Sequence, residues 1–141
     1  MFVSRDVLQQ IVEDLAPAIL RAAGLRRSDD MRKAEDVLLS ALRDFSGGPL
    51  DMIESVDAST AASLLGDPKA VFVYADFLAE RGRVRSGLGR IEAARTDLER
   101  AITLYEKAHV MGLLELEGEG QKEKADSSID AAKDALRALE A

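Results

Sequence analysis

The chain has no cysteine, no tryptophan and a single histidine among its 141 residues. Without cysteine it has no disulfide framework, no thiolate metal site and no cysteine nucleophile. One histidine also excludes a metal site built from several histidines of one chain. The composition therefore removes several classes of enzyme and metalloprotein before any pattern is considered.

Basic residues are fewer than acidic ones, and long apolar runs are missing. The 19 lysines and arginines against 26 aspartates and glutamates give a net charge of -7, so nucleic acid is not an expected partner. The longest apolar run, Ala70 to Ala75, is far shorter than the roughly 20 residues that span a bilayer. The first six residues lack the pattern of a signal peptide. We therefore expect a cytoplasmic protein without a membrane segment.

Alanine and leucine dominate what is present, with 22 and 19 copies, and apolar residues recur every three or four positions. This spacing predicts an all-α fold of about six or seven helices. We expect one helical domain over 1–141: an N-terminal helical hairpin (1–46), a loop with short helices (47–66) and a C-terminal helical array (67–141). The expected helices cover 4–23, 28–45, short stretches of 50–66, 68–89, 90–109, 110–116 and 127–141.

Several residues predict where these helices begin and end. Pro17 lies inside the first apolar pattern, so we expect a kink or break there. Gly24 is expected to end that helix. Asp67 followed by Pro68 is a strong start signal. The residues after it have high β propensity, but the spacing from Val71 to Leu78 favours a helix.

One helix pattern occurs more than once. Residues 91–98 align with 129–136 at an offset of 38, and 31–41 align with 91–101 at an offset of 60. In each copy a small alanine (Ala34, Ala94 or Ala132) precedes a leucine by four residues. A small residue lets two helices approach closely, and the leucine fills the groove beside it. Generic packing of Ala/Leu-rich helices is the alternative explanation.

The unit over about 74–108 resembles the tetratricopeptide repeat, a helix–turn–helix unit of about 34 residues. The matching positions are Leu78, Gly82, Gly89, Ile91, Ala94, Leu98 and Ala101. Larger aromatic positions of the repeat are filled differently, and the unit after Leu116 is degenerate. The resemblance implies helical hairpins in a right-handed array that bind protein partners. The chain also resembles a family of small bacterial helical proteins with Arg5 and Asp6 near the start of a long helix, which implies a fold and no activity.

An arginine cluster interrupts the acidic composition. Arg81, Arg83, Arg85 and Arg90 occur with no acid between positions 81 and 90. One interpretation is a patch that binds phosphate, nucleic acid or an acidic peptide. In a tetratricopeptide-like fold, Asp76 and Arg83 would lie on the helix face that lines the groove. The other interpretation, which we favour, is that the arginines form internal ion pairs with the acids Glu115, Glu117, Glu119 and Glu123.

Catalytic patterns are weak. Glu106 and His109 have the Glu-x-x-His spacing of di-iron bundles, but those sites need a second such motif and further glutamates. The glycines between Gly82 and Gly89 do not complete a phosphate-binding loop. We therefore expect no catalytic residues, metal or cofactor. The expected function is a non-enzymatic protein-interaction or scaffold module that forms a homodimer, with Asp76, Arg83, Arg85 and Arg90 as candidate partner-binding residues.

Overall fold

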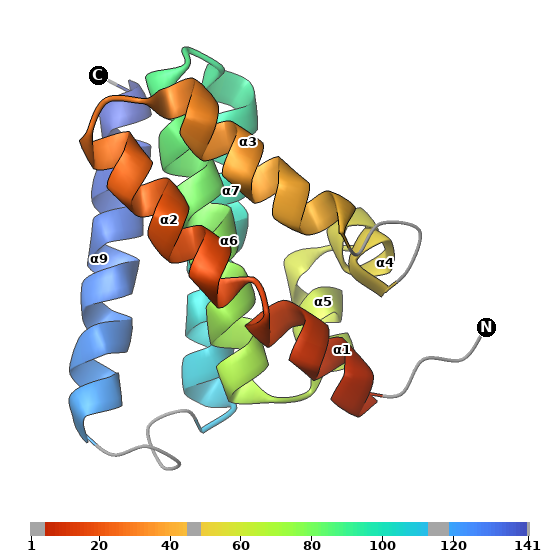
Figure 1. The fold of residues 1–141 in the computed structure, drawn as a ribbon. Helices are drawn as coiled ribbons and strands as arrows, with labels where there is room; N and C mark the ends of the chain where they lie inside the picture. Colours follow the sequence, from red (N-terminus) through yellow and green to blue (C-terminus); the bar gives the residue numbers. More distant parts are fainter. Residues whose placement is uncertain (1–4, 45–48, 113–118, 141) are drawn as a thin grey trace.

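A computed structural model describes residues 5–44, 49–112 and 119–140, and Figure 1 shows the arrangement of its helices. Every regular element within these ranges is an α-helix, so the predicted all-α fold is confirmed. The helices are α1 (Arg5–Glu13), α2 (Ala16–Arg27), α3 (Met31–Arg43), α4 (Pro49–Ser55), α5 (Ala58–Leu65), α6 (Pro68–Gly87), α7 (Ile91–Val110) and α9 (Glu119–Glu140).

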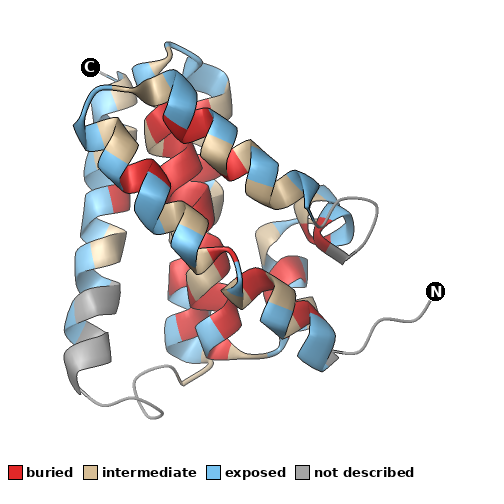
Figure 2. Cartoon of the chain, viewed as in Figure 1, coloured by how far each residue is buried: buried red, intermediate tan, exposed pale blue. Residues whose placement is uncertain are grey.

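Helix α6 is the centre of the fold. It contacts α1, α2, α3, α5, α7 and α9, and its most extensive contact is with the antiparallel helix α7 (Figure 1). The α2–α3 hairpin crosses one side of α6, while α9 lies along α7 on another side. Buried positions concentrate on α6 and on the faces turned toward it (Figure 2). A helix that is buried on most sides needs apolar residues all round its surface. This explains the run of apolar residues from Ala70 to Ala75 near the start of α6.

The start of α6 confirms the sequence prediction. The Asp67 side chain accepts a hydrogen bond from the Ala70 backbone N–H at 3.1 Å, and Pro68 occupies the first turn. This capping satisfies a donor that has no partner inside the helix. The apolar residues that follow, including Val71 and Phe72, are buried in a helix despite their β propensity.

The N-terminal segment breaks at Pro17 as expected, because α1 ends at Glu13 and α2 begins at Ala16. The prediction that Gly24 ends α2 is wrong. The helix continues to Arg27, and the following turn holds Asp29 in the left-handed region with a φ of 61°. A glycine inside a helix costs only about 1 kcal/mol, which packing of Leu25 against the core offsets.

The C-terminal helix also differs from the prediction. It begins at Glu119, eight residues before the predicted start at 127, so Gly120 lies inside the helix and does not interrupt it. Helix α7 ends at Val110, and most of the short helix predicted over 110–116 lies outside the described residues.

The predicted spacer alanines Ala34, Ala94 and Ala132 are all fully buried. At the α6–α7 contact the approach is close enough to require glycine. A Cβ placed on Gly82 would lie 2.8 Å from Leu98 Cγ and 3.3 Å from the Ala94 carbonyl oxygen. None of the described helices is both long and apolar enough to cross a membrane.

Candidate functional site

A buried ion-pair network joins α4, α6 and α7, and we call it the Arg81 network. Arg81 donates from Nε and Nη2 to the two carboxylate oxygens of Asp97, at 3.0 Å each. Its Nη1 donates to Glu54 at 2.6 Å, and Arg85 donates to Asp97 at 2.9 Å. The guanidinium also lies 5.3 Å from the centre of the Phe77 ring. Arg81 and Asp97 are 7% and 3% exposed, so this part of the network is withdrawn from solvent.

The network shifts the ionisation of its members. Burial alone would raise the pKa of Glu54, but the charge and hydrogen bond of Arg81 and the hydrogen bond from Tyr74 hold that pKa below its usual value. Burial alone would lower the pKa of Arg81. Its hydrogen bonds and ion pairs with Asp97 and Glu54 outweigh burial and hold that pKa above its usual value. Burial and the neighbouring Glu54 raise the pKa of Tyr74. All three groups thus keep the protonation states that the ion pairs require at neutral pH.

Arg100 of α7 stabilises the end of α4 beside this network. It donates to the Val56 carbonyl at 2.6 Å and to the Ile53 carbonyl at 3.4 Å. A cation at a helix C-terminus satisfies carbonyls without helical partners and opposes the negative end of the helix dipole. Sequence reasoning missed Arg100, Glu54 and Asp97, because nothing in the spacing places α4 beside the α6–α7 hairpin.

The other clustered arginines also have acidic neighbours. Arg83 Nη1 lies 3.6 Å from Oε1 of Glu80, which is only 2% exposed. Glu80 also accepts a hydrogen bond from Arg26 Nε of α2 at 2.6 Å. Arg90 pairs with Glu35 of α3. Among the described residues the arginines do form internal ion pairs, and the acids in these pairs belong to α3, α4, α6 and α7. Of the predicted partners Glu115, Glu117, Glu119 and Glu123, the first two lie outside the described residues, and Glu123 is exposed.

Asp76 lies beside Tyr105 of α7, and the charge of Arg83 also acts on this tyrosine. Asp76 accepts a hydrogen bond from the Tyr105 hydroxyl at 2.5 Å, close to Ser128 of α9. Burial and the Asp76 carboxylate raise the pKa of Tyr105, and the charge of Arg83 opposes that effect. The four predicted partner-binding residues therefore do not form one patch. Asp76 and Arg83 share one side of α6, Arg85 points to Asp97 and Arg90 reaches α3.

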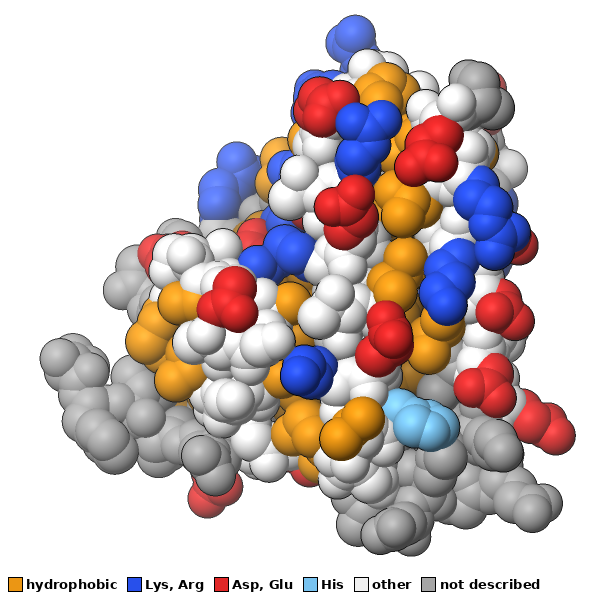
Figure 3. All heavy atoms as spheres, turned by 180° about the vertical axis from the view of Figure 1, so that it is seen from behind, with side chains coloured by type: hydrophobic (Ala, Val, Ile, Leu, Met, Phe, Trp, Pro, Cys, Tyr) orange, Lys and Arg blue, Asp and Glu red, His pale blue; other side chains and the backbone are white. Residues whose placement is uncertain are grey.

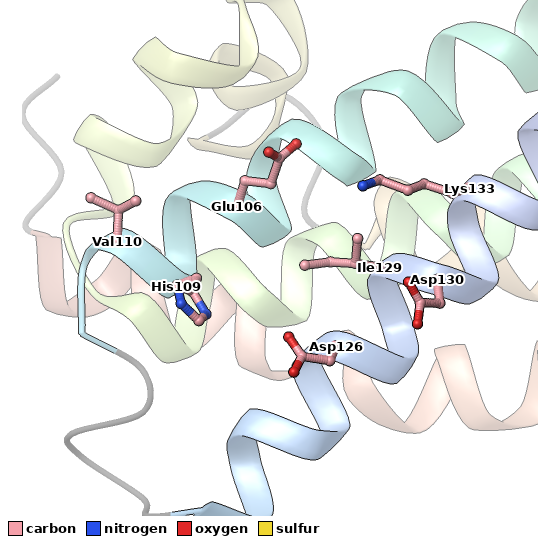
Figure 4. Close-up of a pocket in the computed structure, with 7 residues that line it drawn as sticks. All are labelled: Glu106, His109, Val110, Asp126, Ile129, Asp130 and Lys133. Carbon is pink, nitrogen blue, oxygen red and sulfur yellow. The ribbon is translucent and has the colours of Figure 1, made fainter.

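A groove between α7 and α9 forms an open cavity lined by described residues. Its volume is about 520 Å³. Figure 4 shows Ile129 pointing from α9 toward α7, with charged side chains around it. We call it the α7–α9 groove, and its lining residues are Glu106, His109, Val110, Asp126, Ile129, Asp130 and Lys133.

The α7–α9 groove contains the predicted Glu-x-x-His pair, with two aspartates facing it from α9 (Figure 4). These groups are nevertheless too dispersed for a metal ion. In the described ranges no three side chains of the His, Cys, Asp or Glu type converge on one point in a way that could hold a cation. The groove therefore offers separate surface charges around an apolar floor.

Comparisons with protein-family models, with curated proteins and with solved structures find no match to this chain.

Proposed function

We propose that this chain is a non-enzymatic protein-interaction module that uses the α7–α9 groove. The observation that carries the proposal is a stripe of apolar side chains between columns of charged ones, over α7 and α9 (Figure 3). Ile91 is 38% exposed, Val110 is 82% exposed, and Ile102 and Ile129 are only partly buried. Apolar surface rimmed by charge is typical of sites where another protein binds.

The buried polar groups support a structural role for the interior. Arg81, Asp97 and Glu80 all have charged partners, and every buried side-chain nitrogen or oxygen among the described residues has a hydrogen-bond partner. A nucleophile or general base usually needs access to a ligand. The exposed groove is therefore the better candidate for contact with other molecules.

We also propose that α6 and α7 form a tetratricopeptide-like hairpin against which α9 packs. The close approach at Gly82, with Leu98 filling the space beside it, supports this proposal. So does the burial of the spacer residues Ala94 and Ala132. The homodimer and the cytoplasmic location stay predictions. Sedimentation velocity at several concentrations tests the first, and fractionation of the source cell tests the second.

Binding of anions or nucleic acid through the Arg81–Arg90 cluster is the alternative function. For this, a phosphate would have to displace Asp97 from Arg81 and Arg85. The buried Asp97 carboxylate would then lose its charged partners, which is energetically unfavourable. Arg90, whose side chain is 55% exposed, is the most accessible of the four. Retention of nucleic acid by Arg83→Glu and Arg90→Glu variants over a salt series would test this function, since real binding weakens steeply with salt.

Site-specific photocrosslinking tests the main proposal. A photoreactive residue in place of Lys133 lies in the α7–α9 groove, whereas one in place of Ser59 lies exposed on α5. We expect ultraviolet irradiation in the source cell to give a discrete protein adduct from position 133 and none from position 59. Identical adduct patterns at the two positions would contradict the proposal.

A further inference from the structure

We infer that the occupant of the α7–α9 groove is a basic amphipathic helix of another protein. This inference rests on the proposed interaction function and specifies the partner. Its basis is the distribution of charge along the groove, which differs between the two ends.

Toward the start of α7, beyond the residues that line the cavity, two arginines are paired within their own helices. Arg95 bonds to Glu92 at 2.7 Å on α7, and Arg137 bonds to Asp134 at 2.8 Å on α9. Each pair joins residues three positions apart on one helix surface. The opposite charges largely cancel, so each pair exerts little electrostatic attraction on a ligand. These two pairs therefore add little net charge to that part of the surface.

At the other end the rim is acidic. Glu106, Asp126 and Asp130 line the cavity and are exposed, and Lys133 is the only lysine among the described residues that line it. No ion pair between described residues includes any of these three carboxylates. Lysines or arginines of a partner would gain charge-assisted contacts without displacing any pair formed between described residues.

The floor of the groove selects an amphipathic partner. Ile129 and Ile102 are half-buried against the core, and Val110 stands exposed at the acidic end. Two neighbouring helices form a groove in which a third helix can insert apolar residues at i, i+3 and i+4. Basic residues on the flanks of such a helix would then lie over the carboxylates.

A second copy of the same groove fits poorly. A symmetric dimer places a surface against itself, so the acidic ends would meet acidic ends or the ends already neutralised by internal pairs. Like charges at an interface oppose association. The charge pattern therefore favours a basic partner over self-association through this groove.

A designed peptide of about 18 residues, with leucines on one helical face and lysines on its flanks, tests the inference. Its control is the same peptide with glutamates in place of lysines. Fluorescence anisotropy measures the dissociation constant with the full chain, and amide chemical shifts locate the binding site. We expect the lysine peptide to bind, to shift the end of α7 and the middle of α9, and to weaken as salt rises from about 0.05 to 0.3 M.

Two triple variants with equal changes in net charge separate groove binding from general attraction to an acidic protein. The groove variant carries Glu106→Gln, Asp126→Asn and Asp130→Asn. The matched variant neutralises three exposed acids around the separate cavity between α2 and α3: Asp14→Asn, Asp36→Asn and Asp44→Asn. Since exposed ion pairs each contribute modestly, we expect about tenfold weaker binding in the groove variant and less than twofold change in the matched variant.

Equal weakening in both variants, or equal binding of the glutamate peptide, would overturn the inference. So would a dimer in sedimentation velocity that Val110→Glu dissociates, because a second copy would then occupy the groove. A protein adduct from position 133 without lysine-peptide binding would leave the interaction function standing and remove only the basic partner. Lysine-peptide binding without an adduct would contradict the cellular function while supporting the charge preference of the groove.

Discussion

The same substitution at two helical glycines should change stability in opposite directions. Gly24 lies within α2, and a Cβ added there would meet no atom within 4 Å. Gly82 lies within α6, where an added Cβ would lie 2.8 Å from Leu98 Cγ and 3.3 Å from a backbone oxygen of α7. Gly24→Ala and Gly82→Ala therefore separate intrinsic helix preference from the space between helices.

Intrinsic preference favours alanine over glycine by about 0.8–1 kcal/mol inside a helix. We therefore expect Gly24→Ala to raise the free energy of unfolding by about 0.5–1 kcal/mol. At Gly82 the same gain is opposed by an overpacking cost of about 1–3 kcal/mol, since the backbone of α7 cannot move aside. The net expectation for Gly82→Ala is a loss of about 1 kcal/mol.

Urea unfolding followed by circular dichroism measures both free energies, with equal m-values as the check on two-state behaviour. A double-mutant cycle with Leu98→Ala locates the clash, because alanine at 98 lacks the Cγ and Cδ2 atoms that Gly82 faces. In that background Gly82→Ala should cost less, because only the contact with the Ala94 carbonyl oxygen remains. If Gly82→Ala stabilises the protein as much as Gly24→Ala does, α6 and α7 do not approach as closely as the structure has them.

Three further predictions concern the buried polar groups. Asp97→Ala removes the carboxylate that pairs with Arg81 inside the protein and should cost roughly 3–5 kcal/mol in urea unfolding, whereas Asp134→Ala, at an exposed pair, should leave stability unchanged within error. The pKa of Glu54 is lower in the folded than in the unfolded chain, so the wild type should be more stable than Glu54→Gln at neutral pH. This advantage should shrink as the pH falls through the lowered pKa. A difference in unfolding free energy that stays constant at acid pH would contradict the ion pair. Tyr74 and Tyr105 both have a raised pKa in the folded protein, so their contribution to stability should be complete below pH 10 and lost above it. The ultraviolet absorbance of phenolate should therefore appear only as the protein unfolds. Ionisation near pH 10 in the native state would show that the hydroxyls are not buried.

Local sequence signals predicted much of the secondary structure. The Asp67–Pro68 start is correct because a cap and a fixed φ act within one turn and need no partner from elsewhere. The break at Pro17 is correct for the same reason, since its ring collides with its own chain. The burial of Ala34, Ala94 and Ala132 was also predicted correctly, because the apolar face of a helix must turn toward the helices that it packs against.

Signals that depend on a balance of energies predicted less. Gly24 favours a helix end by only about 1 kcal/mol, and packing of the surrounding helix against the core outweighs it. The last helix starts well before its predicted cap at Ser127, because capping residues permit a helix start without requiring one.

The partners of the arginines were decided by the tertiary structure alone. Sequence spacing offered the acids at 115 to 123, one repeat onward, whereas the structure brings Glu54 and Asp97 to Arg81 and brings Glu35 to Arg90. Charge acts over distances in space and carries no periodicity along the chain, so only the docking of α3, α4 and α7 on α6 selects the pairs. By itself the sequence determined that the chain is helical and acidic. The packing determined which charges are buried and paired and which remain exposed at the α7–α9 groove.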